Sequence, residues 1–289
     1  WEPHSRAERI DSLLSRFQHY TARDAQQMQI DFLSPYSQDL MSFLIPIIDK
    51  YKSLYDETET EAFTTLKFWD NIMSVDQSAP SIFSVFFDRL LYHTFADELG
   101  DELFSRYVSI SSLPTRKLLE IVQSGQSDWF DNVGTATKES LDDVVYSSWR
   151  EAVKTLREMY GSDDCDSWKW GTIHTIRLRH SITGFDFLRP AVDIGPFAIG
   201  GNNTTINNTE YKIGKSFQVA VGASERFVAD MDDSIVHVSL PGGASGEPLS
   251  ANYSDQVQLW LNGGYISIPV AEKPSDKFRL AISAKPKKK

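Results

Sequence analysis

Residue types that could carry chemistry are sparse in this chain, and few are spaced for it. None of the six histidines has the HExxH spacing that places two zinc ligands and a general base on one helix face. His174 and His180 share the segment HTIRLRH, where their spacing directs both to one face of a strand, but the neighbouring sequence offers no further ligands. The residues alone therefore indicate no metal site.

The single cysteine, Cys165, excludes an internal disulfide and a cysteine-based zinc site. It lies in the segment SDDCDSW, whose acidic residues lack the glycine and the distal glutamate of an EF-hand loop. We therefore interpret this segment as a solvated turn and the cysteine as incidental.

The glycine-rich segment LPGGASGEP lacks the Lys-Ser/Thr pair of a phosphate-binding loop, and the chain has no GxSxG motif. Glycines in such a loop let the backbone approach another group closely. Ser245 lies in this loop, and Arg226 begins the strand-like segment RFVADM. No pattern gives either residue a catalytic role, and loop and sheet architecture account for both.

One arginine stands at an unusual position in the opening segment WEPHSRAERIDSLL. Ser5 and Glu8 have the spacing of a capping box, and an apolar stripe follows at helical spacing, formed by Ile10, Leu13, Leu14 and Phe17. This pattern places Arg6 at the first helical position, where the helix dipole disfavours a cation. The residues alone leave two readings open, a snorkelling or ion-paired structural arginine and a functional one.

Helices precede strands along the chain. Predicted helices cover residues 22–33 after Thr21, residues 38–51 after Ser37, a buried segment from 81 to 99, and residues 137–160 with Gly161 as the stop. Predicted strands cover residues 216–223, 226–231, 234–240 and 277–283, with a late helix in 253–264 that Ser254 caps and Gly263 ends. This order indicates an α+β protein, because alternating βαβ units would mix the two.

Composition excludes several classes of protein. The formal net charge of −11, with KPKKK at the terminus as the sole basic cluster, disfavours a nucleic-acid surface. No run approaches the roughly 18 apolar residues of a membrane helix, so we expect no membrane partner. Sequons at Asn202, Asn203, Asn207 and Asn252 point weakly to a glycosylating exterior.

These segments together resemble the penicillin acylase family of N-terminal-nucleophile hydrolases. The resemblance rests on WEPHSRAERIDSLL, HTIRLRH, GGNNTTIN, ASERFVADMDD and LPGGASGEPLSANYSDQVQLWLNGGY. Ala251 and Asn252 replace the proline and histidine that this family commonly has in the last segment. The resemblance implies a partial four-layer αββα sandwich, with a helical excursion over residues 1–165 and strands of the sandwich over residues 166–289.

The resemblance also implies an activity that this chain completes only with other segments. Family members process themselves to expose an N-terminal serine, which attacks an acyl amide through an acyl-enzyme, and an asparagine helps to form the oxyanion hole. Trp1 is no such nucleophile, so the resemblance implies that this chain is the C-terminal half of the larger β chain. Its partners would be the upstream β segment and the smaller α chain, and the chain alone would be inactive.

Further expectations follow from the same resemblance. Arg6 falls on the family's active-site arginine, which orients the nucleophile and the oxyanion hole. Substrates would be β-lactam side-chain amides, N-acyl homoserine lactones or related small acyl amides, and the location periplasmic or extracellular. This chain would carry no cofactor, and any calcium ligands of the complete enzyme would lie elsewhere. The alternative is a non-catalytic, secreted binding module that retains the fold.

Overall fold

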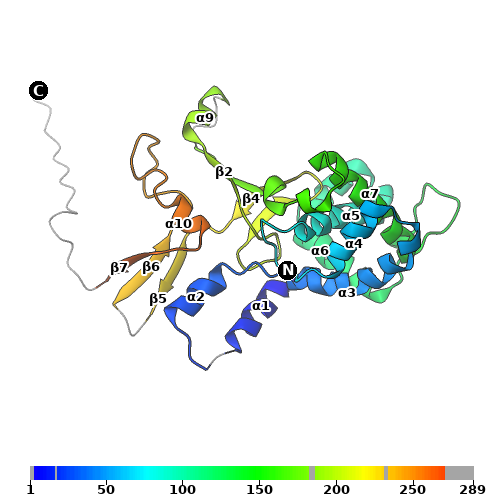
Figure 1. Ribbon diagram of the computed structural model, residues 1–289, viewed down its shortest axis with the longest axis horizontal. Helices are drawn as coiled ribbons and strands as arrows, with labels where there is room; N and C mark the ends of the chain where they lie inside the picture. Colours follow the sequence, from blue (N-terminus) through cyan, green and yellow to red (C-terminus); the bar gives the residue numbers. More distant parts are fainter. Residues whose placement is uncertain (1–2, 17, 182–185, 231–233, 271–289) are drawn as a thin grey trace, which may run out of the picture.

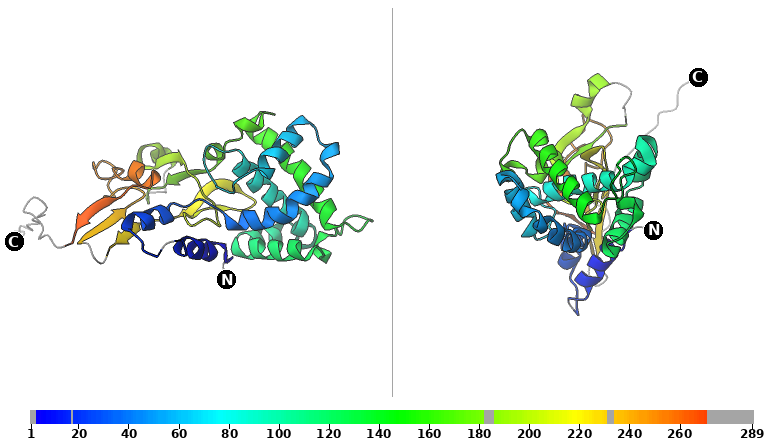
Figure 2. Two further views of the ribbon diagram at one scale, coloured as in Figure 1. Left: turned by 60° about the horizontal axis from the view of Figure 1, so that its bottom comes forward. Right: turned by 90° about the vertical axis from the view of Figure 1, so that its right-hand side faces the viewer.

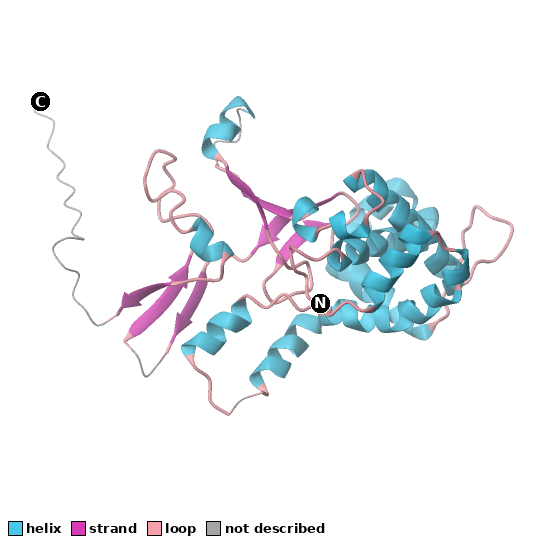
Figure 3. Cartoon of the chain, in the orientation of Figure 1, coloured by secondary structure: helices cyan, strands magenta, loops and turns pink. Residues whose placement is uncertain are grey.

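Apolar residues at helical spacing build a helical bundle at one end of an elongated molecule, and small antiparallel sheets extend toward the other end (Figures 1 and 2). This computed structural model describes residues 3–16, 18–181, 186–230 and 234–270. Figure 3 shows that the helices α1 (Ser5–Leu14) and α2 (Ala22–Gln29) lie below the sheets in that view. Helix α2 contacts the strand that begins at Arg226, whereas α1 contacts the helix that begins at Pro35.

The bundle is assembled around one buried helix. Its members are α3 (Pro35–Lys50), α4 (Glu57–Lys67), α5 (Ala79–Val108), α6 (Ser112–Ser124) and α7 (Leu141–Tyr160). Helix α5 packs most extensively against α7, and Phe86 of α5 meets Trp149 of α7 edge-to-face at 5.6 Å. The buried helix predicted over 81–99 is confirmed, and it continues through a kink at Gly100, whose φ is +68°.

The helix ends depend on local capping groups, and some differ from the prediction. Thr21 caps α2 (Ala22–Gln29) in a capping box with Asp24, as predicted for its start. Ser34, not Ser37, caps α3, because Pro35 occupies the first helical position and fixes the start there. Helix α7 begins after Ser140 rather than near residue 137, and it ends as predicted at Gly161 in a left-handed conformation.

Helix α1 (Ser5–Leu14) starts one residue earlier than the sequence predicted. His4 already has helical backbone angles, so Ser5 lies inside the helix and its side chain makes no capping bond. Arg6 is therefore the second helical residue, and the expected capping box is wrong. Phe17 lies outside the described residues.

The strands form separate antiparallel pairs and one triplet. β1 (Thr175–Leu178) pairs with β2 (Ile194–Ala198), and β3 (Thr209–Lys212) pairs with β4 (Ser216–Gly222). β6 (Ile235–Ser239) lies between β5 (Arg226–Ala229) and β7 (Ile266–Pro269), with Arg226 opposite Ser239. The strand predicted over 277–283 lies outside the described residues. The structure thus confirms an α+β organisation with strands at 216–222, 226–229 and 235–239.

Short helices lie before and between the strands. Helix α8 (Trp170–Ile173) precedes β1, whereas α9 (Arg189–Val192) and α10 (Val257–Leu261) lie between strands. Single 3-10 turns are at Lys52–Leu54, Asp128–Phe130, Cys165–Ser167 and Asp186–Leu188. Helix α10 is shorter than the predicted 253–264, and Gln256 rather than Ser254 precedes it without a side-chain cap. Within the described residues, no helix is both long enough and apolar enough to cross a membrane.

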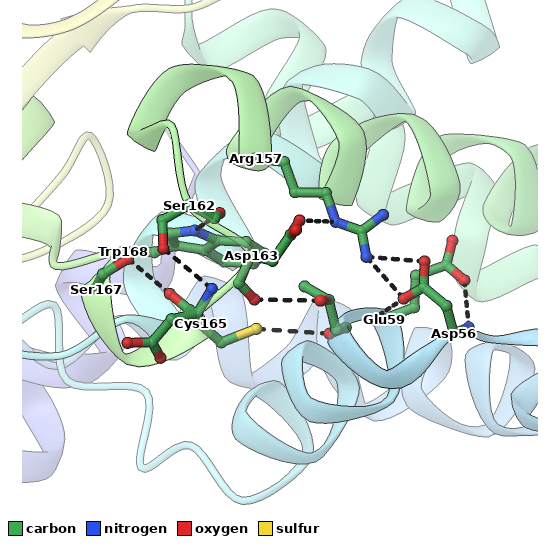
Figure 4. A network of polar contacts seen from close by, with 10 residues as sticks. Asp56, Glu59, Arg157, Ser162, Asp163, Cys165, Ser167 and Trp168 are labelled. Atoms are coloured by element: carbon green, nitrogen blue, oxygen red, sulfur yellow. Dashed lines mark hydrogen bonds and ion pairs between the residues drawn. The ribbon is translucent and has the colours of Figure 1, made fainter.

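The segment SDDCDSW is anchored to the bundle rather than freely solvated (Figure 4). Arg157 of α7 donates from Nη2 to both carboxylate oxygens of Asp56 at 2.8 Å and forms an ion pair through Nε with Asp163 at 2.9 Å. The Cys165 side chain is buried, with Sγ 3.5 Å from the carbonyl oxygen of Thr58. Burial raises the pKa of this thiol to about 12, so Cys165 is a packed, unreactive residue and the solvated-turn interpretation is wrong for it.

A buried carboxyl group joins the bundle to the β3–β4 hairpin. Asp88 of α5 is 7% exposed, and its Oδ2 accepts a hydrogen bond of 3.0 Å from the backbone N–H of Gly214. Its Oδ1 has no partner among the described residues. Burial raises the pKa of Asp88 to about 7, although the Gly214 N–H and the Arg89 charge lower it.

This pKa predicts a pH-dependent stability that one substitution should remove. The pKa in the folded state exceeds the ordinary value of 3.8, so folding favours the protonated form and stability falls as pH rises from about 4 to about 7. The slope should approach about 1.4 kcal/mol per pH unit. Asp88→Asn retains an acceptor for Gly214 and should raise the thermal midpoint at about pH 8 but not at about pH 4.

The comparison is made in the full-length protein, with the exposed Asp128→Asn as the matched control. A midpoint for Asp88→Asn that tracks wild type at both pH values would contradict the account.

Candidate functional site

Arg6 projects from a helix that the described chain covers only in part. Arg6 is partly exposed and makes no hydrogen bond or ion pair with any described residue. Ile10 and Leu14, from the predicted apolar stripe of α1, are 42% and 46% exposed. Ser5 is the sole residue of α1 that is buried, and its hydroxyl has no partner among the described residues. The apolar face of α1, which the sequence pattern predicted to be buried, is therefore largely exposed among the described residues.

A bidentate ion pair holds the same helix from another side. Arg9 donates from Nε to Oδ1 of Asp31 at 3.0 Å and from Nη2 to Oδ2 at 2.7 Å. The two side chains are 12% and 16% exposed. The pair lines a pocket of about 260 Å³ between α1 and α2, together with Leu13, Arg16, Tyr20, Asp24, Gln27 and Met28. Two parallel bonds to a carboxylate fix both the distance and the orientation of the guanidinium.

Arg226 is a buried cation with neutral partners. It is 3% exposed, and its guanidinium carbon lies 4.5 Å from the centre of the Trp260 ring. Nη1 donates to the carbonyl oxygen of Trp260 and Nη2 donates to Oδ1 of Asn207 at 3.2 Å, while Nε has no partner among the described residues. Burial lowers the pKa of Arg226, yet a guanidinium stays charged at neutral pH. Arg226 thus ties β5 to α10 and to the loop before β3.

That loop is held by its own polar side chains. Oδ1 of Asn202 accepts from the backbone N–H of Thr204 at 2.8 Å, and Oδ1 of Asn203 accepts from the N–H of Tyr211 at 3.0 Å. Asn202 and Asn207 are 4% and 2% exposed, so the sequons there are buried in this fold. The backbone N–H of Asn207 donates to the carbonyl oxygen of Asp31 at 3.1 Å. This bond connects the Arg226 cluster to the Arg9–Asp31 pair.

The glycine-rich loop folds onto its own continuation. A Cβ atom at Gly243 would lie 2.1 Å from the carbonyl oxygen of Asn252, so only glycine fits there. The backbone N–H of Ser245 donates to the same oxygen at 3.0 Å, and the Ser245 hydroxyl accepts from the N–H of Glu247. Ser245 has architectural contacts alone among the described residues. Asn252 contributes its backbone carbonyl to both contacts.

The two histidines of HTIRLRH do not form a site together. His174 is buried, stacks on Trp170 at 4.3 Å and donates from Nδ1 to the carbonyl oxygen of Phe217. Burial lowers its pKa to about 4, so the ring is neutral at pH 7. His180 lies beyond the end of β1, and its Nε2 contacts the carbonyl oxygen of Gly246 instead.

The described residues offer no metal site. They contain no group of three or more His, Cys, Asp or Glu side chains that could hold an ion.

The sequence patterns singled out Arg6 and Arg226, but they did not indicate Arg9 and Asp31, which connect the first helix to the loop before β3. Arg9 and Asp31 are 22 residues apart, and Asp31 meets the loop at Asn207 through a backbone carbonyl. Neither the separation between Arg9 and Asp31 nor that between Asp31 and Asn207 matches the spacing of a helix or a strand, so no sequence pattern marks these contacts. The one available signal was the position of Arg9 three residues after Arg6, which places both arginines on neighbouring parts of one helix surface.

The sequence is similar to known proteins along most of its length. The penicillin amidase family model matches residues 1–277. An acyl-homoserine lactone acylase QuiP from Pseudomonas aeruginosa is 24% identical over 303 residues, which cover 96% of this chain and 36% of that protein. The protein of the same name from Pseudomonas syringae pv. tomato is 27% identical over 299 residues, covering 96% of this chain and 35% of its own.

A solved structure has a related fold. The thermostable penicillin G acylase from Alcaligenes faecalis superposes with a TM-score of 0.53 and 15% sequence identity, covering 99% of this chain and 54% of that one. This likeness confirms the predicted N-terminal-nucleophile hydrolase fold. The chain spans about a third of the length of the curated relatives that it matches. Because the family model extends over nearly the whole sequence, this chain belongs to the penicillin amidase family.

Proposed function

We propose that the full-length protein is an amidohydrolase, to which this chain contributes the helix that carries an active-site arginine. The observation that carries the proposal is the family match over residues 1–277, which includes α1. The nucleophilic serine and the oxyanion asparagine would lie on residues that precede Trp1 in the full-length protein. The upstream β segment and a smaller α chain from the same precursor would complete the site.

The surroundings of Arg6 support its proposed role. Its guanidinium is free of partners among the described residues, whereas Arg9, one turn away, is fully engaged by Asp31. A planar guanidinium can hold several carbonyl or amide oxygens at once. In the assembled enzyme, Arg6 would orient the nucleophile, its amino group and the oxyanion asparagine.

Exposed apolar side chains support the proposal of partner segments. In the β5–β6–β7 sheet, Phe227, Ile266 and Ile268 lie on one face and are 52%, 40% and 45% exposed. The exposed stripe of α1 adds Ile10 and Leu14. The sheet residues are neighbours across the strands, and an exposed apolar patch of this kind marks contact with other protein surfaces.

N-acyl homoserine lactones are the proposed substrates, because several relatives are named acyl-homoserine lactone acylases. The reaction breaks the amide C–N bond and consumes one water. It yields a free carboxylic acid from the acyl chain and homoserine lactone with a free amine. Penicillins, which contain a similar side-chain amide, are the alternative substrate class.

The purified full-length protein should therefore release homoserine lactone from an N-acyl homoserine lactone. An amine-reactive reagent and mass spectrometry of the acid detect both products, and residues 1–289 expressed alone should release neither. Opening of the lactone ring with the amide intact would contradict the amidase assignment. No turnover of lactones or penicillins by the processed protein would favour the non-catalytic binding module.

Arg6→Lys should lower kcat by about a hundredfold with little change in KM. An ammonium group has fewer hydrogen-bond donors than a guanidinium and no planar fork, so it cannot hold several groups in position at once. The thermal midpoint should stay near that of wild type, since Arg6 has no partner among the described residues. Arg23→Lys, at an exposed position on α2, is the matched control. A kcat for Arg6→Lys equal to that of the control would remove Arg6 from the site.

A further inference from the structure

We propose that Arg9, Asp31, Asn207 and Arg226 form a positioning network that fixes α1, and therefore Arg6, relative to the strands. None of the four is proposed to touch the substrate. The inference rests on the proposed function, because it assigns the network a catalytic consequence that is transmitted through Arg6.

Helix α1 has few restraints apart from the Arg9–Asp31 pair. Its apolar residues Ile10 and Leu14 are about half exposed, and its most extensive packing against a described helix is with α3. The bidentate Arg9–Asp31 pair is therefore the strongest directional contact between α1 and the described chain. Because Arg6 lies three residues before Arg9, a rotation or slide of α1 about this pair would displace Arg6 directly.

Asp31 is itself held in place by backbone hydrogen bonds. Its Oδ1 also accepts from the backbone N–H of Leu33 at 3.2 Å, and its carbonyl oxygen accepts from Asn207. Ile30, the residue before it, packs against Gly263 after α10, where a Cβ atom would lie 2.7 Å from the Ile30 side chain. Asp31 thus connects α1 to the strand region at a point where the backbone cannot shift freely.

The buried Arg226 secures the end of the network that is remote from α1. Arg226 holds the Asn207 side chain and the Trp260 carbonyl with the same guanidinium, and it forms no ion pair with any described carboxylate. Burying a cation without an anionic partner is costly. The planar donors of arginine reach two segments at once, which a lysine ammonium at this position cannot do with the same geometry. This offers a reason for a buried arginine where a hydrophobic residue would pack more simply.

Together these contacts form a continuous path from α1 through Asp31 and the 200–208 loop to β5 and α10. Catalytic groups must be placed to within a fraction of an ångström, and a misplacement of about 1 Å lowers turnover by about a hundredfold. Weakening the path should therefore lower kcat more than it raises KM. A purely structural role would instead lower the thermal midpoint or the fraction of active enzyme, leaving kcat per active site unchanged.

The test is made in the full-length processed protein, with active sites counted by a covalent serine-directed inhibitor. Asp31→Asn keeps the shape of the side chain and removes its charge, and it should lower kcat per active site by about tenfold. Arg226→Lys should act in the same direction. The matched controls are Asp11→Asn, at an exposed position on α1, and Arg177→Lys, at an exposed position on β1.

A double-mutant cycle with Arg6→Ala separates the two proposals. If the network acts through Arg6, Asp31→Asn should change kcat by less than about twofold in the Arg6→Ala background, because the group that it positions is already gone. An equal loss in both backgrounds would overturn the network proposal, as would a loss of thermal stability with unchanged kcat. If Arg6→Ala itself retains wild-type kcat, the assignment of Arg6 fails, and the network proposal fails with it.

Discussion

The bidentate pair between Arg9 and Asp31 is the contact on which the placement of the first helix depends. Helix α1 lies beside the bundle with much of its apolar stripe uncovered, so burial of apolar area does little to fix it on this chain. A carboxylate that engages two guanidinium nitrogens restricts rotation as well as distance. The Asp31 backbone then carries this restraint to the loop at Asn207 and to the strands beyond it.

Buried polar groups recur wherever distant parts of the chain meet. Asp88 ties α5 to the β3–β4 hairpin, His174 ties the start of β1 to β4, and Arg226 ties β5 to α10. Each has neutral rather than ionic direct partners, so each depends on hydrogen bonds in a site of low polarity. Such bonds are directional, and breaking one leaves a buried group without a partner. They specify how the bundle and the small sheets are joined, a task that non-directional apolar packing does less sharply.

The sequence was most informative where local physics decides the structure. The apolar spacing of α7, the glycine at its end and the capping box of α2 all follow from residues within a turn or two of one another. The predicted caps were wrong at the starts of two helices. Pro35 occupies the first helical position of α3, so Ser34 is its cap, and His4 before α1 already has helical backbone angles, so Ser5 lies inside that helix. Arg226 was recognisable as part of a strand, but its burial against Trp260 was not, because that contact joins residues 34 apart through a helix and a sheet. The acidic neighbours of Cys165 suggested a solvated turn, whereas the Cys165 side chain itself is buried against the carbonyl oxygen of Thr58, a contact between residues 107 apart.

The central claim is that the Asp31 carboxylate fixes α1, and amide hydrogen exchange measures this without reference to activity. In the full-length protein, the account predicts that Asp31→Asn speeds exchange of the α1 amides after the first turn, from Arg9 to Leu14, while amides in the middle of α7 keep their wild-type protection. Unchanged protection of α1 in the variant would show that other contacts hold the helix, and would contradict the account.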